Sequence, residues 1–315
     1  MTPNLPLITI GITCFNAANL ILQAIDHALE QDWPNIEVII VDDGSSDNSV
    51  ACIQSHIQNK SNVRLIKHGQ NQGFPTALNT IIQNASGEYI ALFDDDDISR
   101  KDRLTKQYDR LSNFIAENKT YLIMCYTDRN VKYANQNEVA YRFSAIGGKK
   151  GLEPHGQAVA DYILWDSGQV GYDWGMFGSC TLMVHKKLFE EIGLFDPQFK
   201  RNTEWDMGVR CALAGGYFIA VNEPLITMTK TPTQDKAGKK PLHFSLLLRE
   251  KHKEYLDQNG LYQASRVIAT SRFYGGKGKK FLSLFYMIIA MIMAPKKIGF
   301  DKIKRLINRA KKSRV

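Results

Sequence analysis

Four consecutive aspartates, at positions 94–97, carry the clearest chemical potential in this sequence. They follow an apolar stretch, residues 89–93, whose composition predicts a short buried strand. Adjacent carboxylates repel one another and must stay hydrated or bind a cation. A solvated acidic loop would satisfy them, but open α/β sheets bind their ligands at the carboxyl ends of strands. Because oxygen ligands there suit Mg²⁺ or Mn²⁺ beside a phosphate, we predict a metal–diphosphate site.

Other polar residues follow neighbouring strands in the same way. Apolar, β-branched stretches at 7–13, 36–41 and 63–66 each predict a buried strand, and each ends in polar or glycine-containing sequence. Strand ends of a parallel sheet meet at one edge, so we expect these residues to lie near the aspartates. The candidates are Thr13, Asn16, Asp43, Asn71 and Gly73.

The elements that must position these residues alternate between strand and helix through residue 126. This alternation predicts an α/β fold with a mostly parallel, Rossmann-like sheet and flanking helices. Neither a GxGxxG turn nor a GxxxxGK[ST] loop occurs in that region. The later expected elements are a hairpin at 131–144, strands at 178–184 and 217–221, and helices at 99–115, 187–192, 205–214, 242–256 and 262–274.

Composition restricts the class of protein. The 315 residues are 44% hydrophobic and 23% charged, as expected of a folded chain, and the five cysteines form no CxxC pair. The chain has a formal net charge of +8. Residues 277–315 hold twelve Lys/Arg and one acid, a net charge of +11, so the rest of the chain has a net charge of −3. This slightly acidic net charge of residues 1–276 argues against nucleic acid as a partner. Scattered cysteines and the absence of a signal-peptide pattern predict a cytoplasmic location.

The basic C-terminal segment also contains an apolar stretch, residues 281–294, which Pro295 ends. As a helix, 14 residues would extend about 21 Å, less than the roughly 30 Å of a bilayer core. Residues 300–310 continue with apolar positions at helical spacing among lysines and arginines. We interpret 277–315 as a membrane-associating tail that lies on an anionic surface. A buried helix followed by a basic tail is the alternative.

Four motifs at successive strand ends together resemble glycosyltransferase family 2, the inverting nucleotide-sugar transferases of the GT-A fold. They are TCFN at 13–16, DDGS at 42–45, NxGxxxAxN at 71–79 and FDDDD at 93–97. Each is common alone, and only their order and spacing carry the resemblance. It is strong over residues 5–110, weaker to about 230, and does not include the tail.

The resemblance assigns roles to the first group of candidates. Asp43 matches the residue that accepts the N3–H of the nucleotide base, and Asp96 matches the direct metal ligand. Asp94 and Asp95 match positions that face the ribose or metal-bound water, with Asp94 a second possible ligand. The implied nucleotide-binding set is Thr13, Asn16, Asp43, Asn71, Gly73, Asp94 and Asp95. The implied cofactor is Mg²⁺ or Mn²⁺, which neutralises a departing diphosphate.

An inverting transfer needs one base to accept the proton of the acceptor hydroxyl. Family members often read Glu-Asp-x-Asp-Leu here, whereas this chain has Thr203-Glu204-Trp205-Asp206-Met207. The base position therefore falls on Glu204, whose side chain is one carbon longer than the usual aspartate. Asp206 has two readings, as an acceptor-binding residue or as the N-cap of a helix.

Three more residues match functional regions of the family, each with a structural alternative. Trp174 and Phe177 could stack on an acceptor sugar or pack in the core. Lys230 could belong to a loop that closes over the diphosphate, or be a solvated lysine.

We therefore predict an inverting, metal-dependent glycosyltransferase that uses a nucleotide sugar, and the resemblance alone implies that this donor is a UDP-sugar. The predicted acceptor is lipid-linked or a glycan of bacterial-type lipopolysaccharide or capsule synthesis, at the cytoplasmic face of the plasma membrane. The alternatives are a sugar-nucleotide nucleotidyltransferase and a non-catalytic nucleotide-sugar-binding membrane protein. The predicted divisions are 1–127 for the nucleotide, 128–240 for acceptor and catalysis, a helical extension at 241–276, and the tail at 277–315.

Overall fold

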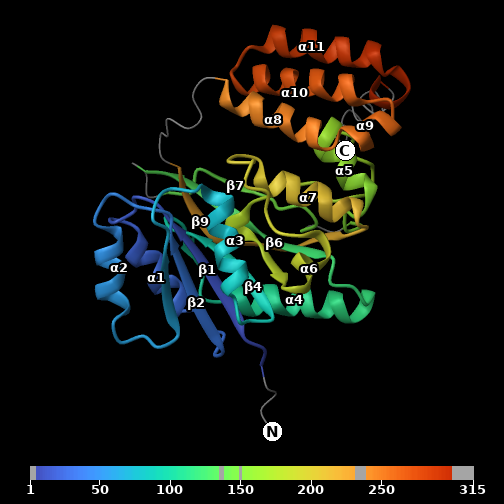
Figure 1. Ribbon diagram of the computed structural model, residues 1–315. Coiled ribbons are helices and arrows are strands. Elements are labelled where there is room, and N and C mark those ends of the chain that lie inside the picture. Colours follow the sequence, from blue (N-terminus) through green and yellow to red (C-terminus); the bar gives the residue numbers. More distant parts are fainter. Residues whose placement is uncertain (1–4, 135–137, 149–150, 231–238, 300–315) are drawn as a thin grey trace.

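The structure is a computed structural model that describes residues 5–134, 138–148, 151–230 and 239–299. Its centre is one nine-stranded sheet with the order β3-β2-β1-β4-β8-β6-β9-β5, and β7 pairs with β6 at the side (Figure 1). Helices cover both faces of this sheet, and a separate layer of helices from the C-terminal part lies beyond one face.

The first four long strands are parallel and form one half of the sheet. They are β1 (Ile8–Cys14), β2 (Ile36–Asp42), β3 (Val63–Lys67) and β4 (Tyr89–Asp94). In register, Ile8 lies opposite Ile36 on one side and Tyr89 on the other. All of β1 is buried, as expected for the apolar, β-branched sequence of a central strand covered on both faces. The carboxyl ends of β1, β2 and β4 therefore share one edge.

The second half of the sheet is mixed. β8 (Met183–His185) runs antiparallel to β4 and β6, while β6 (Ile123–Tyr133) and β9 (Tyr217–Lys230) are parallel to each other. Short β5 (Ile98–Ser99) pairs with β9, and β7 (Tyr141–Phe143) completes the predicted hairpin with β6. β6 runs continuously through the predicted division between residues 127 and 128.

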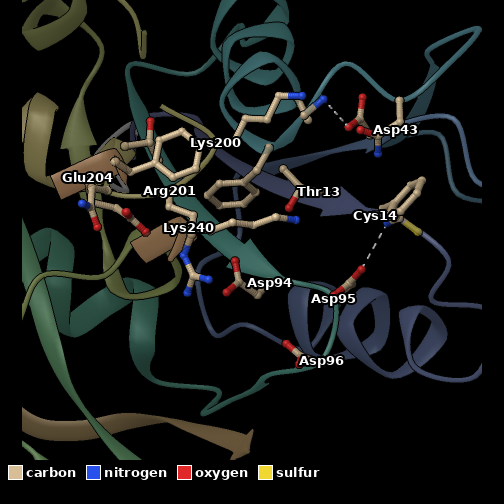
Figure 2. Close-up of a pocket in the computed structure, with 18 of the residues that line it drawn as sticks. Thr13, Cys14, Asp43, Asp94, Asp95, Asp96, Lys200, Arg201, Glu204 and Lys240 are labelled. Atoms are coloured by element: carbon tan, nitrogen blue, oxygen red, sulfur yellow. Dashed lines mark hydrogen bonds between the residues drawn. The ribbon is translucent and has the colours of Figure 1, made fainter. Parts of the chain in front are cut away.

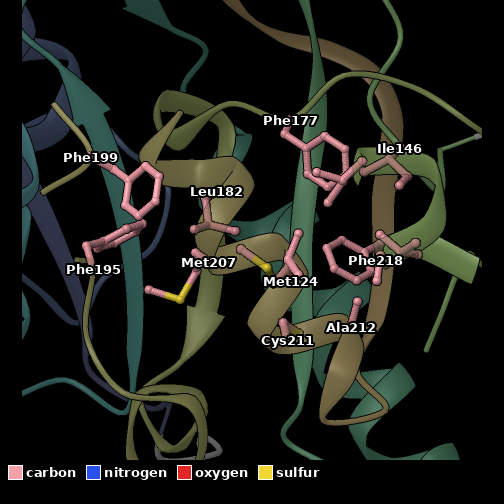
Figure 3. Close-up of a cluster of buried hydrophobic side chains, with 14 of the residues drawn as sticks. Met124, Ile146, Phe177, Leu182, Phe195, Phe199, Met207, Cys211, Ala212 and Phe218 are labelled. Carbon is pink, nitrogen blue, oxygen red and sulfur yellow. The ribbon is translucent and has the colours of Figure 1, made fainter. Parts of the chain in front are cut away.

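Helices pack on the two faces of the sheet through separate apolar clusters. One cluster includes side chains from α1, α2 and α4, and the other includes side chains from α3, α5, α6 and α7. Figure 3 shows the second cluster, where Phe177, Phe218 and Met207 lie among residues of β6 and α7. The bounds are α1 (Ile21–Leu29), α2 (Ser49–Ile57), α3 (Phe74–Asn84), α4 (Arg103–Asn118), α5 (Gln157–Trp165), α6 (Lys187–Ile192) and α7 (Thr203–Leu213).

The C-terminal helices stack outward from the domain in the order α8, α10, α11 (Figure 1). Their bounds are α8 (Lys240–Lys251), α9 (Lys253–Gln258), α10 (Tyr262–Gly276) and α11 (Lys280–Met293), followed by one π-helical turn, Pro295–Gly299. Arg249 of α8 is fully buried and donates to the carbonyl of Leu164 at the end of α5, at 2.9 Å, and to Ser265 Oγ of α10, at 3.2 Å. This arginine fastens the layer to the domain.

The observed elements differ from the expectations in several places. A 3-10 turn (Ser179–Thr181) replaces the first part of the strand expected at 178–184, and α4 begins at Arg103, later than residue 99. The helix expected at 242–256 is broken at His252 into α8 and α9. Within the described ranges, every helix is too short or too polar to cross a bilayer.

Candidate active site

A cavity of about 1030 Å³ opens at the carboxyl ends of β1, β2 and β4, between the N-terminal ends of α3, α7 and α8. Figure 2 shows Asp94, Asp95 and Asp96 on one side of it, and Lys240 and Arg201 reaching in from the side that carries Glu204. The predicted residues that line it are Thr13, Asp43, Asn71, Gly73, Asp94, Asp95, Asp96 and Glu204. The structure thus brings together eight candidates from segments far apart in the sequence.

Asp43 lies just beyond β2 and is 3% exposed. Its Oδ1 accepts from the backbone N–H of Gln72 at 2.9 Å and pairs with His68 Nδ1 at 2.7 Å. Its Oδ2 accepts from the N–H of Gly73 at 2.8 Å. A carboxylate has about four acceptor positions, so these three contacts leave one on Oδ2. Asp43 therefore fixes the loop before α3 and still presents an acceptor.

Gly73 precedes α3 with φ of 97°, a conformation that side chains of L-residues disfavour. The N–H of Gly73 donates to Asp43, and Pro75 follows as expected at the start of a helix. A second loop contact fixes Asn16. Its Oδ1 accepts from the N–H of Ser46 at 2.8 Å, so Asn16 joins the β1 and β2 loops. Asn16 is a neighbour of the cavity wall, whose lining includes Phe15.

The aspartate run is electrostatically unfavourable without a cation. Burial, followed by repulsion from the other three acidic neighbours in the run, raises the pKa of Asp94 well above its usual range. Burial and the charge of Asp96 raise the pKa of Asp95 to about 7, although Asp95 accepts the N–H of Phe15 at 3.4 Å. Burial also raises the pKa of Asp96. A divalent cation would relieve this repulsion, so the donor set fits the predicted metal.

Asp97, the last of the four aspartates, is buried. It is 7% exposed, and within the described residues neither of its oxygens has a nitrogen or oxygen hydrogen-bond partner. Asp94, Asp97 and Cys180 each place one ligand-type atom within 4.8 Å of the other two. Burial and both aspartates raise the pKa of the Cys180 thiol well above its ordinary value, which keeps the thiol protonated. The carboxylates are therefore the better ligands, and they suit a hard cation.

The predicted base, Glu204, lies in the first turn of α7, whose N-terminal end borders the cavity. The helix begins after Asn202, which adopts a left-handed conformation with φ of 63°. Ser179 Oγ donates to Glu204 Oε1 at 3.1 Å and orients the carboxylate. The negative charge of Glu204 also contributes to the raised pKa of Asp94, so the two acids are close enough to repel each other.

Asp206 has neither of the roles that the sequence suggested. It is fully buried within α7, while Asn202 occupies the N-cap position. Its carboxylate pairs with Arg210 at 3.0 Å, Lys251 at 2.9 Å and His252 at 3.0 Å. Burial alone would raise its pKa, but the bond from His252 and the charges of Arg210 and Lys251 lower it to about 2. Asp206 therefore links α7 to the junction between α8 and α9.

Trp174 and Phe177 lie outside the lining of this cavity. Trp174 stacks on Tyr162 with ring centroids 4.4 Å apart, and its Nε1 donates to the carbonyl of Gln169 at 2.8 Å. Phe177 is 5% exposed and contacts the rings of Tyr126, Trp205 and Phe218. For both residues the structure supports packing. The side chain of Lys230 lies outside the described residues.

Several cavity residues were not found from the sequence. Their positive and aromatic side chains come from the segment before α7 and from the first turn of α8: Lys200, Arg201, Lys240, His243 and Phe244. Figure 2 shows the Arg201 guanidinium beside Asp94 and the Lys240 side chain extending across the cavity toward Thr13. Lys200 and Arg201 lie close to Glu204 in the sequence, which could have identified them as cavity residues. Nothing in the sequence of α8 indicated that its first residues line the cavity. His68 was also missed, because only its contact with Asp43 reveals it.

The fold and the carboxylate-lined cavity define a domain of the GT-A type. Residues 9–159 match the model of the family described as Glycosyl transferase family 2, and this segment belongs to that family. The resemblance predicted from the motifs is confirmed. Solved structures of S. aureus TarS 1–349 share the fold. The complex with UDP-GlcNAc aligns with a TM-score of 0.56 at 19% identity, covering 84% of this chain and 80% of that one.

Curated relatives agree with this family. An uncharacterized glycosyltransferase of Haemophilus influenzae is 38% identical over 121 residues, which are 38% of this chain and 46% of the relative. Another, RP339 of Rickettsia prowazekii, is 27% identical over 202 residues, 64% of this chain and 57% of the relative. Chondroitin synthase of Escherichia coli is 36% identical over 97 residues, 31% of this chain and 14% of that protein. The chain thus spans about half the length of the first two relatives.

Proposed function

We propose that this protein transfers a sugar from a UDP-sugar to a hydroxyl group of a glycan or lipid-linked acceptor, with inversion at the anomeric carbon. The observation that carries the proposal is the cavity itself. It joins a base-reading aspartate, an aspartate run and an acid at a helix N-terminus in one space of about 1030 Å³. That volume suits a ligand as large as a nucleotide sugar.

Donor binding is supported by the contacts of Asp43. The remaining acceptor position on its Oδ2 can receive the N3–H of uracil, while the bonds from His68, Gln72 and Gly73 hold the carboxylate still. Preorganisation of this kind strengthens binding because less freedom is lost when the ligand arrives. The UDP-GlcNAc complex of the TarS neighbour supports a uridine donor. Thr13, near the carboxyl end of β1, lines the part of the cavity where we place the nucleotide base.

Departure of the nucleoside diphosphate places negative charge beside Asp94, Asp95 and Asp96. These carboxylates would hold Mg²⁺ or Mn²⁺, which supplies neutralisation of the leaving phosphate. Arg201 and Lys240 line the same cavity, and Figure 2 shows Arg201 beside Asp94 and Lys240 reaching across toward Thr13. Two cations in that position would bind the phosphate oxygens and stabilise the charge that develops there.

Glu204 is the residue proposed to accept the proton of the attacking hydroxyl. Its carboxylate is oriented by Ser179, and Ser179 lies in the 3-10 turn just before β8. A single acid that works as base on the face opposite the leaving group gives inversion, because there is one displacement. A general base of this kind contributes typically about 10²–10⁴-fold to the rate.

The proposed acceptor rests on features outside the donor site. A lipid-linked intermediate of lipopolysaccharide or capsule synthesis, at the cytoplasmic face of the plasma membrane, is consistent with the strongly basic, apolar C-terminal segment. Chondroitin synthase, a relative over 97 residues, is a polysaccharide-forming enzyme by its name.

Calorimetric titration with UDP, with and without Mn²⁺, tests the donor site. We expect Mn²⁺-dependent binding by the wild-type protein and loss of that dependence in Asp96→Ala. Glu204→Gln should bind UDP as tightly as the wild type but transfer sugar about 10²–10⁴-fold more slowly. Glu191→Gln, an exposed acid of α6, is the matched control and should change neither quantity.

Three results would change the proposal. Binding to dTDP or GDP but not UDP would assign another nucleotide class to the same site. Normal turnover by Glu204→Gln would remove Glu204 from the mechanism. Failure to bind any of these nucleotides would contradict the donor site and favour a non-catalytic domain.

A further inference from the structure

The outer face of α11 presents large apolar side chains to solvent. Phe281 is 91% exposed, Ile292 73%, Leu284 58% and Phe285 57%, and Ile288 continues the same stripe. Their spacing is that of one helical face. Scattered exposed apolar residues are ordinary on a protein surface, but a continuous stripe along a whole helix marks a docking surface.

The opposite face of α11 is satisfied by α10. Ser271 Oγ donates to the carbonyl of Ser283 at 2.6 Å, and the rings of Tyr274 and Tyr286 stack with centroids 5.5 Å apart and planes at 7°. Ala290 is fully buried in the same interface. The helix is therefore fixed in orientation, and in the described part of the chain nothing covers its outer stripe. Exposure of that stripe follows from the packing and is not an effect of a loose helix.

Charge selects the kind of partner for this face. Residues 277–299 contain five lysines and no acid: Lys277, Lys279, Lys280, Lys296 and Lys297. They lie at the two ends of the apolar stripe, which is the pattern of a helix lying in the interface of an anionic bilayer. Lys297 also donates to the carbonyl and side chain of Asn259, at 2.9 Å, so the basic end is anchored to the helical layer.

We propose that the outer face of α11 is a membrane-docking surface that lies in the interface of an anionic leaflet, parallel to the bilayer plane. The 14 residues of α11 would be about 21 Å long, too short to span the membrane core. The surface lies entirely within the described residues. The amphipathic stretch predicted at 300–310 lies outside them and is not needed for it.

The stacking of helices fixes where the cavity lies relative to this surface. α10 contacts both α8 and α11, and the first turn of α8 lines the cavity. Packed helices are separated by 8–10 Å, so the axis of α11 lies about 16–20 Å from that of α8. The docked protein would thus hold its cavity above the lipid headgroups and open to soluble donor. UDP binding should consequently be independent of vesicles.

Vesicle co-sedimentation of the full chain tests the surface. The variant combines Phe281→Ser, Phe285→Ser and Ile292→Ser, and the control combines Leu152→Ser and Val170→Ser, which are 64% and 63% exposed elsewhere. We expect the wild type and the control to bind phosphatidylcholine–phosphatidylserine vesicles and to bind pure phosphatidylcholine weakly. The triple variant should bind at least about tenfold more weakly, since one large apolar side chain contributes that much when buried.

Each outcome decides one way. Equal sedimentation of the triple variant and the wild type, or no wild-type binding to anionic vesicles, would overturn the proposal. A wild-type dimer in sedimentation velocity that the triple variant loses, without vesicle binding, would assign the face to a second copy of the chain. UDP titration of the same variants separates this inference from the proposed function, because the substitutions lie two helix layers from the cavity.

Discussion

Replacing Asp95 by asparagine should stabilise the protein in the absence of metal. Asp95 is only partly exposed among other carboxylates, and its pKa is raised from 3.8 to about 7. The native state therefore holds a proton that the unfolded chain releases between these values, so the free energy of unfolding falls as pH rises through that window. Asparagine keeps an oxygen for the N–H of Phe15 and removes the charge.

The magnitude follows from the pKa difference. About three pKa units at 1.36 kcal/mol each give roughly 4 kcal/mol of unfavourable free energy once Asp95 is fully ionised. Because neighbouring aspartates share this repulsion, we expect removal of one carboxylate to recover about 2 kcal/mol at pH 8. At pH 5 the gain should be less than half as large, since most of the native Asp95 is then protonated.

Urea denaturation in EDTA at pH 5 and pH 8 measures this difference. The control is Asp47→Asn in a neighbouring loop, where hydrogen bonds from Ser49 lower the pKa, so the substitution should bring no gain at pH 8. Adding Mn²⁺ at pH 8 should stabilise the wild type more than Asp95→Asn. A variant that is no more stable than wild type at pH 8, or a gain independent of pH, would refute the electrostatic account of the aspartate run.

Two further predictions concern Asp206 and Phe177, which the sequence suggested as acceptor-binding residues and which are buried in the structure. Asp206→Ala should lower the free energy of unfolding by roughly 2–3 kcal/mol, because it removes a fully buried carboxylate that bonds to Arg210 and to the buried His252. Asp196→Ala, which removes a more exposed partner of Lys251, should cost much less in the same urea titration. Phe177→Ala should destabilise by about 3–5 kcal/mol in thermal and urea unfolding, whereas Met176→Ala, at an exposed neighbour, should not. An increase in acceptor KM with unchanged stability would instead return Phe177 to the acceptor site.

Local sequence was sufficient for the donor half of the site. The strands that lead to Thr13, Asp43 and Asp94 are continuous apolar segments, and parallel strands bring their carboxyl ends to one edge whatever else surrounds them. The turn at Gly73 was also local, because its backbone conformation demands glycine. The length and apolarity of α11 likewise needed only the sequence.

Packing decided what the sequence left open. Phe177 and Asp206 have residue types that suit either a binding site or an interior, and periodicity does not reveal which neighbours will surround them. Asp206 became structural only because His252 and Lys251, more than forty residues later, reach it. The position of Lys240 in the cavity also depends on tertiary packing, because it requires α8 to pack on α5 and α10.

The sequence by itself therefore determined the family of residues 9–159, the strand-end carboxylates and the short apolar C-terminal helix. The tertiary structure decided the positive side of the cavity, the partners of Asp43 and the direction of the apolar face of α11. The physical reason is the distance along the chain between the residues that interact. Backbone conformation and strand burial are set by neighbours along the chain, whereas ion pairs and exposed faces depend on which distant elements pack together.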